Sequence, residues 1–82
     1  MPTKGQHARR CKALPPFLRS MREGAGRTQR ELEEWVGKPQ SWVHNCETAN
    51  RRVDLSEFIA WCDARGVTPQ KGLAGFLKLT AH

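Results

Sequence analysis

The sequence predicts a single all-α domain of five short helices, preceded by a flexible basic arm over residues 1–15. Three observations predict this class. From residue 16 onward, apolar residues recur at the three- and four-residue spacing of one helix face, with no alternating run that would indicate a strand. Two capping boxes mark helix starts, and Gly or Pro residues interrupt the pattern at short intervals. A chain of 82 residues and 9.3 kDa has room for one core, so residues 16–82 are expected to form one domain.

The predicted arm holds most of the excess positive charge. Its basic residues are Lys4, Arg9, Arg10 and Lys12, and it has no acidic residue, so it supplies four of the six net charges. Its low apolar content and lack of periodicity predict a flexible segment that ends at Pro15-Pro16. Such an arm could lie along DNA phosphates or enter a minor groove, or it could be a solvated tail, and the sequence leaves both open.

The first two helices follow the arm. Pro15-Pro16 predicts the start of the first, because proline suits the first helical turn, and glycines at 24 and 26 end it. Thr28-x-x-Glu31 is a capping box that predicts the start of the second helix, and the three-residue turn Gly37-Lys38-Pro39 ends it. The residues expected to be buried here are Phe17, Leu18, Met21, Ala25, Leu32, Trp35 and Val36.

Three further helices complete the predicted domain. The third spans about residues 40–48, and a loop over residues 49–52 follows it. Asp54-x-x-Glu57 predicts the cap of the fourth helix, and Thr68-Pro69 predicts the start of the fifth. The buried side of the fourth helix is expected to hold Leu55, Phe58, Ile59 and Cys62. Trp35, Trp42 and Trp61 recur among aliphatic residues at helical spacing, which favours core packing over stacking on unpaired bases.

Composition excludes several classes of function. The net charge of +6 and pI near 9.9 indicate a polyanionic partner such as nucleic acid. The three cysteines form no C-x-x-C pair, so we expect neither a disulfide framework nor a metal, and no cofactor motif is present. Glu31, Glu33 and Glu34 crowd one short helix without a nucleophile beside them, so we expect a solvated face and no enzyme. The longest apolar run is too short for a membrane span, so we expect a cytoplasmic protein. With a nucleic acid as partner, it would be associated with the nucleoid.

The second and third helices have the features of a helix-turn-helix. The turn that joins them is short and contains Gly37, and this motif places its second helix in the DNA major groove. At 100° per residue, one face of the third helix is polar and free of carboxylates. Glutamine and asparagine can bond the adenine edge, and serine and histidine can bond several base edges. The predicted base-contacting residues are therefore Gln40, Ser41, His44 and Asn45.

The spacing of these residues resembles a known family. The matching residues are Thr28-Gln29-x-x-Leu32, Gly37, Pro39-Gln40-Ser41-Trp42-Val43, Glu47 and Arg51-Arg52-Val53-Asp54. Together they resemble the helix-turn-helix domain of phage repressors and Cro-like regulators, the XRE type, over about residues 17–70. The resemblance implies a repressor from a phage or mobile element that binds a palindromic operator in double-stranded DNA as a homodimer.

The resemblance also implies roles for single residues. Gln29 matches a family glutamine that binds a phosphate beside the helix N-terminus. Arg22 and Glu47 match a buried ion pair between the first and third helices. The full set expected to contact the DNA backbone is Thr28, Gln29, Arg30, Lys38, Arg51 and Arg52.

Three positions depart from the family pattern, and one of them is Cys46, which replaces a larger apolar residue whose space Trp42 could fill. Glu33 stands where the family usually has alanine, so either its side chain extends outward or the two helices are spaced differently. Pro39 stands at the usual Ser or Thr cap of the third helix, so that side-chain cap is lost.

Several alternatives remain at this point. The fifth helix could form the dimer surface or could complete the monomer core with the same residues, which are Leu73, Phe76, Leu77 and Leu79. The main partner could be a protein toxin, as in antitoxins of this fold, although no long toxin-wrapping tail is present. The protein could also be an adaptor that has lost DNA binding, or a binder of RNA or single strands.

Overall fold

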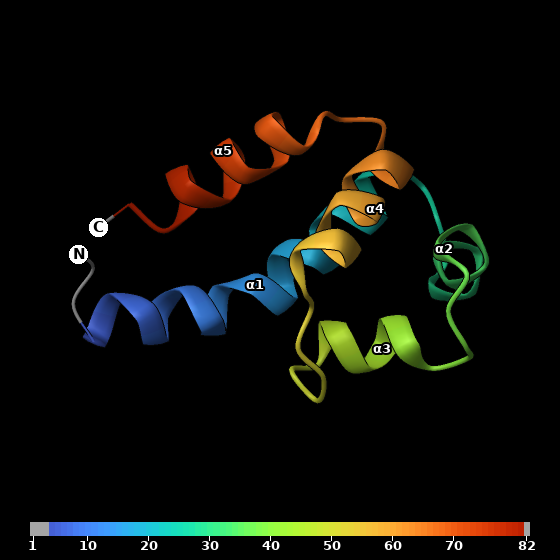
Figure 1. Ribbon diagram of the computed structural model, residues 1–82, viewed down its shortest axis with the longest axis horizontal. Helices are drawn as coiled ribbons and strands as arrows, with labels where there is room; N and C mark the ends of the chain where they lie inside the picture. The colour runs from blue at the N-terminus through green and yellow to red at the C-terminus, as the bar shows by residue number, and fades with distance from the viewer. Residues whose placement is uncertain (1–3, 82) are drawn as a thin grey trace.

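The computed structural model describes residues 4–81, and of residues 4–7 only the backbone. These residues form five helices, α1 (Lys4–Gly24), α2 (Gln29–Val36), α3 (Trp42–Glu47), α4 (Leu55–Arg65) and α5 (Pro69–Leu79) (Figure 1). Helices α1 to α4 form one packed group, and α5 packs against α4. In Figure 1, α3 and α5 lie at opposite edges of the molecule with α1 and α4 between them. The predicted all-α class is confirmed.

The start of α1 differs from the prediction. The helix begins at Lys4, so residues 4–15 are helical and the two prolines lie inside α1. A proline inside a helix removes one backbone donor and costs about 3 kcal/mol, which is why the sequence indicated a helix start there. The apolar stripe that continues across the prolines explains the longer helix, because Leu14 packs against the core one turn before the buried Leu18. Residues 1–3 of the predicted arm lie outside the described residues.

The predicted caps are present at the starts of α2, α4 and α5. Thr28 Oγ1 accepts from the backbone N–H of Glu31 at 3.1 Å, and the Glu31 carboxylate accepts from the N–H of Thr28 at 2.8 Å. Asp54 and Glu57 form the same reciprocal pair at α4. Thr68 caps α5, whose first turn contains Pro69. These pairs satisfy N–H groups that a helix start leaves without partners.

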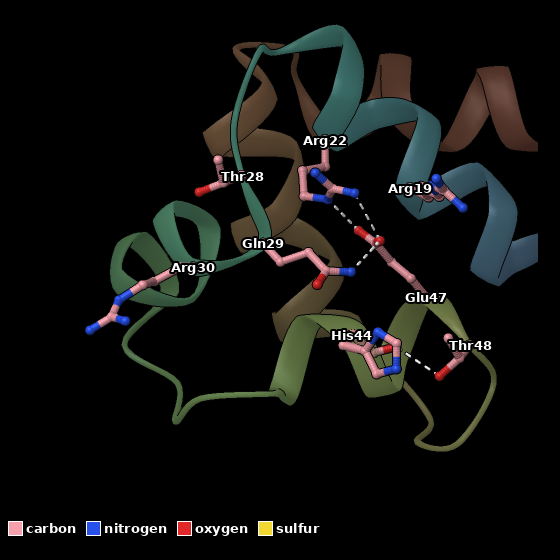
Figure 2. Close-up of a pocket in the computed structure, with 8 residues that line it drawn as sticks. All are labelled: Arg19, Arg22, Thr28, Gln29, Arg30, His44, Glu47 and Thr48. Carbon is pink, nitrogen blue, oxygen red and sulfur yellow. Dashed lines mark hydrogen bonds and ion pairs between the residues drawn. The ribbon is translucent and has the colours of Figure 1, made fainter.

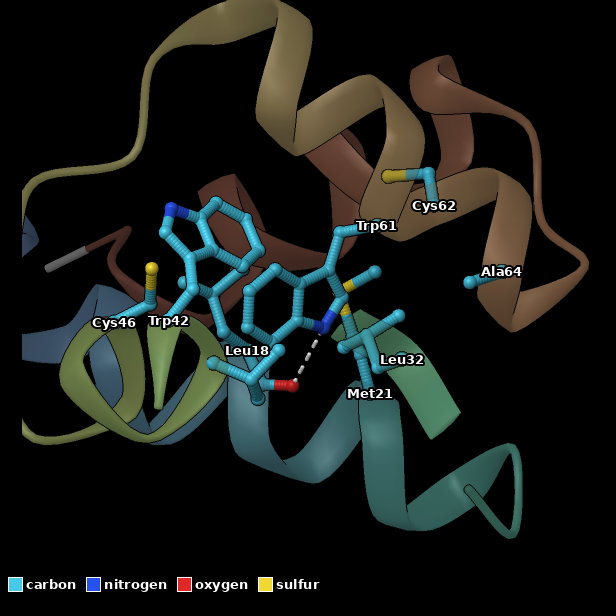
Figure 3. Packing of buried hydrophobic residues seen from close by; sticks show 9 residues of the cluster. Leu18, Met21, Leu32, Trp42, Cys46, Trp61, Cys62 and Ala64 are labelled. Carbon is cyan, nitrogen blue, oxygen red and sulfur yellow. Dashed lines mark hydrogen bonds between the residues drawn. The ribbon is translucent and has the colours of Figure 1, made fainter. Parts of the chain in front are cut away.

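The core lies where α1, α2, α3 and α4 meet, and Trp61 of α4 is at its centre (Figure 3). The Trp61 side chain is fully buried and its Nε1 donates to the carbonyl of Leu18 at 3.0 Å. Its ring lies 5.7 Å from that of Trp42. These contacts attach α4 to α1 and α3. Burial raises the pKa of the nearby Cys46 thiol to about 11, so this side chain acts as a small neutral residue.

Three residues expected in the core are exposed. Trp35 is 55% exposed, and the Arg27 guanidinium lies 4.6 Å from its ring centroid. The buried side of α2 is formed by Leu32 and Glu33, and Trp35 lies about 110° away from it at 100° per residue. Leu55 and Ile59 are also exposed, because the buried side of α4 is rotated toward Trp61 and Ala64, although it still includes the expected Cys62. The residues that α4 buries are Glu57, Trp61, Cys62 and Ala64.

Candidate DNA-binding surface

The link between α2 and α3 is longer than predicted. It covers residues 37–41, five residues instead of three, and α3 ends at Glu47. Gly37 adopts the left-handed conformation that ends α2, with φ of 72°. Ser41 is also left-handed, with φ of 73°, and this delays the start of α3 to Trp42. Gln40 and Ser41 therefore precede the helix on which the sequence placed them.

Glu33 supplies the cap that α3 lacks. Its side chain is buried, with the whole residue only 5% exposed, and Oε2 accepts from the backbone N–H of Val43 at 2.9 Å. Ser41, the residue at the N-cap position, makes no side-chain cap bond. A carboxylate at a helix N-terminus satisfies an N–H group and interacts favourably with the helix dipole. Of the two alternatives left open for Glu33, outward extension is therefore excluded, and the prediction that Glu33 belongs to a solvated face is wrong.

Polar side chains from α1, from the start of α2 and from α3 line one surface (Figure 2), and the link adds Gln40 and Ser41 to it. A hollow of about 630 Å³ lies between α1, α2 and α3, and a neighbouring hollow of about 250 Å³ lies between α2, the link and α3. Gln29, Arg30 and His44 line both hollows. The structure thus brings together six of the predicted DNA-contacting residues, which are Thr28, Gln29, Arg30, Gln40, Ser41 and His44.

Glu47 organises the floor of the larger hollow. Its carboxylate lies 2.6 Å from Nε of Arg22 and 3.1 Å from Nη2, which is the ion pair that the family resemblance implies. The hydrogen bond from Arg22 to Glu47 raises the arginine's pKa. Gln29 Nε2 donates to the same carboxylate at 3.1 Å, and this bond fixes the orientation of the Gln29 amide. Three helices are joined at one buried carboxylate.

Lys38 and Arg51 lie in a second cluster. Lys38 Nζ is 3.1 Å and Arg51 Nη2 is 3.3 Å from Oε2 of Glu57. Both cations also lie over the Trp42 ring, at 5.5 and 5.6 Å from its centroid. Their charges are therefore partly neutralised before any phosphate approaches. The cluster connects the link before α3 to the loop after it.

The remaining predicted residues lie elsewhere. Arg52 lines a different hollow of about 360 Å³, which lies between α1 and the loop after α3. Asn45 is half-buried and lines neither polar hollow, and its carbonyl accepts from the backbone N–H groups of Asn50 and Arg51. This bonding shapes the loop that carries the two arginines.

Arg19 is a candidate contact that sequence reasoning missed. It lines the larger hollow and its side chain is 63% exposed, with Glu23 one turn further along α1 at 3.3 Å. No motif marks it. The sequence feature that could have identified Arg19 is its position three residues before Arg22, because residues three apart lie on neighbouring parts of one helix face.

The Glu57 cluster predicts an acid-dependent contribution to stability. Burial opposes ionisation of Glu57, but the N–H of Asp54, Lys38 and Arg51 together hold its pKa below its ordinary value of 4.5. A lowered pKa stabilises the fold above about pH 4.5, and this contribution is lost as the pH falls through the folded-state pKa. Glu57→Gln is expected to lower the urea midpoint at pH 7, and the gap to wild type should shrink at pH 3. An equal gap at both values would contradict this.

These features define the class of protein. A short exposed helix follows a capped helix through a glycine-containing link, and polar residues of both line one surface, as in a helix-turn-helix DNA-binding domain. No helix in the described part of the chain is long and apolar enough to cross a membrane, and no group of three potential metal ligands occurs there.

Comparisons with known proteins give the family. The model of a helix-turn-helix domain family matches residues 16–71. An XRE-family like protein from Pseudomonas syringae pv. tomato str. DC3000 has a solved structure that is 39% identical, covers 94% of both chains and superposes with a TM-score of 0.82. No curated protein matches the chain. The chain belongs to the XRE family of helix-turn-helix DNA-binding proteins, which is a non-enzymatic family.

Proposed function

We propose that the protein is a cytoplasmic transcriptional repressor that binds a palindromic operator as a homodimer, and that it belongs to a phage or other mobile element. The observation that carries the proposal is the shared surface of Gln40, Ser41 and His44 beside the N-terminus of α2. The amide of Gln40 can bond an adenine edge, and His44 can donate to a guanine or a phosphate. Occupying a promoter in this way excludes polymerase.

Phosphates bind at the start of α2 in this proposal. A helix N-terminus favours a bound anion, and Arg30 adds an exposed positive charge at the start of α2. Gln29 is held by Glu47, so its orientation is set before DNA arrives. The weaker, partly neutralised phosphate contacts from Lys38 and Arg51 come from the second cluster, and Arg52 adds a contact from the loop after α3. Asn45 of α3 is kept as a base contact in this proposal.

The proposed dimer follows from the small size of α3. One helix of six residues reaches only a few base pairs, so useful specificity needs two copies on half-sites about 34 Å apart. Leu73, Leu77 and Leu79 are exposed on α5, which supports an apolar dimer contact there. The Phe76 ring centroid lies 5.4 Å from that of Phe17, which supports assigning Phe76 to packing within the monomer.

Selection from a random duplex library tests this function. The enriched sequence should be an inverted repeat whose half-site centres are about 10 base pairs apart, with two chains per duplex. The double variant Gln40→Ala/His44→Ala should lose the preference for this sequence over a scrambled duplex by tenfold or more, because each good base contact discriminates by about 1–3 kcal/mol. Absence of any enriched motif would contradict sequence-specific binding, and preference for unpaired competitor would indicate a single-strand binder.

A further inference from the structure

The N-terminal part of α1 extends beyond the core and carries only basic charge. Core packing on α1 runs from Leu14 to Met21, whereas residues 4–13 precede it and contain four basic residues and no acidic one. We infer that the DNA-binding surface continues along α1, where Lys12 and Arg19 bind backbone phosphates beyond those reached by α2 and α3. This inference rests on the proposed function and adds a second contact region to it.

Arg19 connects this region to the site already described. It lines the larger hollow together with Gln29 and His44, at its α1 wall (Figure 2). Lys12 lies seven residues earlier on the same helix. Seven residues amount to about 700°, so the two side chains leave the helix within about 20° of each other and about 10.5 Å apart along its axis. That distance spans about three base-pair steps of 3.4 Å.

The residues of α1 that face the loop after α3 help to locate the side of the helix that carries Lys12 and Arg19. Cys11, Leu14 and Leu18 lie toward the loop after α3, because they line one hollow with Ala49 and Val53. At 100° per residue from Cys11, Lys12 lies at 100° and Arg19 at about 80°. Arg19 itself lines the polar hollow, and Lys12 lies within about 20° of it, so Lys12 belongs to the same side of α1.

Both side chains are available for phosphates. Lys12 is exposed and forms no ion pair with any residue that the structure describes. Arg19 pairs with Glu23, but the two side chains are 63% and 54% exposed, and an exposed pair of this kind contributes little. Exchange of Glu23 for a phosphate therefore costs little. By contrast, Arg22 is committed to Glu47 and stays structural.

The test is the salt dependence of duplex binding by full-length variants. Each phosphate contact contributes about 0.9 to the slope of log affinity against log salt. Lys12→Ala/Arg19→Ala should make the slope shallower by about 1.8 and weaken binding about 30-fold at 0.15 M salt, equally for operator and scrambled duplex. Lys12→Ala alone should account for about half of the change in slope. Circular dichroism checks that α1 stays helical.

Lys71→Ala/Lys78→Ala is the matched control. These lysines are also exposed, also seven residues apart on one helix, and belong to α5 at the opposite edge of the molecule from α3 (Figure 1). At 100° per residue they lie about 100° or more around α5 from Leu73 and Leu77 and about 80–100° from Leu79, so the substitutions leave the three exposed leucines in place. If the α1 variant loses no more slope than this control while wild type binds its operator, the inference is overturned alone. If wild type shows no salt-dependent duplex binding, the proposed function falls with it.

Discussion

Replacing Glu47 by alanine is expected to lower the free energy of unfolding by about 3–5 kcal/mol, because it leaves a buried arginine without its counter-charge. The side chains of Arg22 and Glu47 are 11% and 2% exposed, and their closest atoms are 2.6 Å apart. Gln29 also loses its acceptor, so the start of α2 loses a tie to α3. Urea denaturation followed by circular dichroism measures the loss.

Two comparison variants separate a buried pair from a surface pair. Arg22→Met/Glu47→Leu removes both charges and should recover most of the stability, since a buried pair replaced by apolar residues is often nearly neutral. Glu23→Ala breaks the exposed pair with Arg19 and should cost less than about 1 kcal/mol. A loss below 1 kcal/mol for Glu47→Ala would mean that water reaches Arg22 and that the pair is not buried in solution.

The features that the sequence predicted well are determined locally. The capping boxes at Thr28 and Asp54 need only residues three apart, and their side chains bond as the spacing requires. The left-handed end of α2 at Gly37 is equally local. The helix count follows from these boundaries.

The features that the sequence missed depend on tertiary packing. Trp35 and Leu55 have the right helical spacing, but the rotation of each helix about its axis is set by its partners, which periodicity does not specify. The two prolines of α1 signal a helix start until the burial of Leu14 and Leu18 on either side is known. Lys38 and Arg51 appeared free for DNA because Glu57, which binds both, is distant from one of them in sequence.

Glu33 is the clearest example of a role that the sequence could not predict, because this role depends on Val43, ten positions away. The sequence identified it as a departure from the family but left its direction open. The structure shows that its carboxylate accepts from the N–H of Val43 and so replaces the side-chain cap that Ser41, the residue at the N-cap position, does not make. A polar residue at a usually small position therefore compensates for a missing cap on the next helix.

Glu33→Ala is accordingly expected to affect specificity more than general DNA affinity. A helix of six residues is not stable alone, so its position depends on tertiary bonds such as this one. Loss of the carboxylate leaves the buried N–H of Val43 unsatisfied, which costs about 1–3 kcal/mol of stability. The start of α3, which follows Gln40 and Ser41, should shift or fray.

The expected signature is a split between two measured quantities. The ratio of operator to scrambled-duplex affinity should fall by tenfold or more, because base contacts need a fixed helix start. The salt slope should stay within about 0.5 of wild type, because phosphate contacts from α2 persist. Glu33→Gln keeps an acceptor oxygen at the same reach and should retain most of the specificity. If Glu33→Ala lowered stability but left the ratio unchanged, α3 would be positioned by Trp42 and Val43 packing alone, and the cap would serve only the fold.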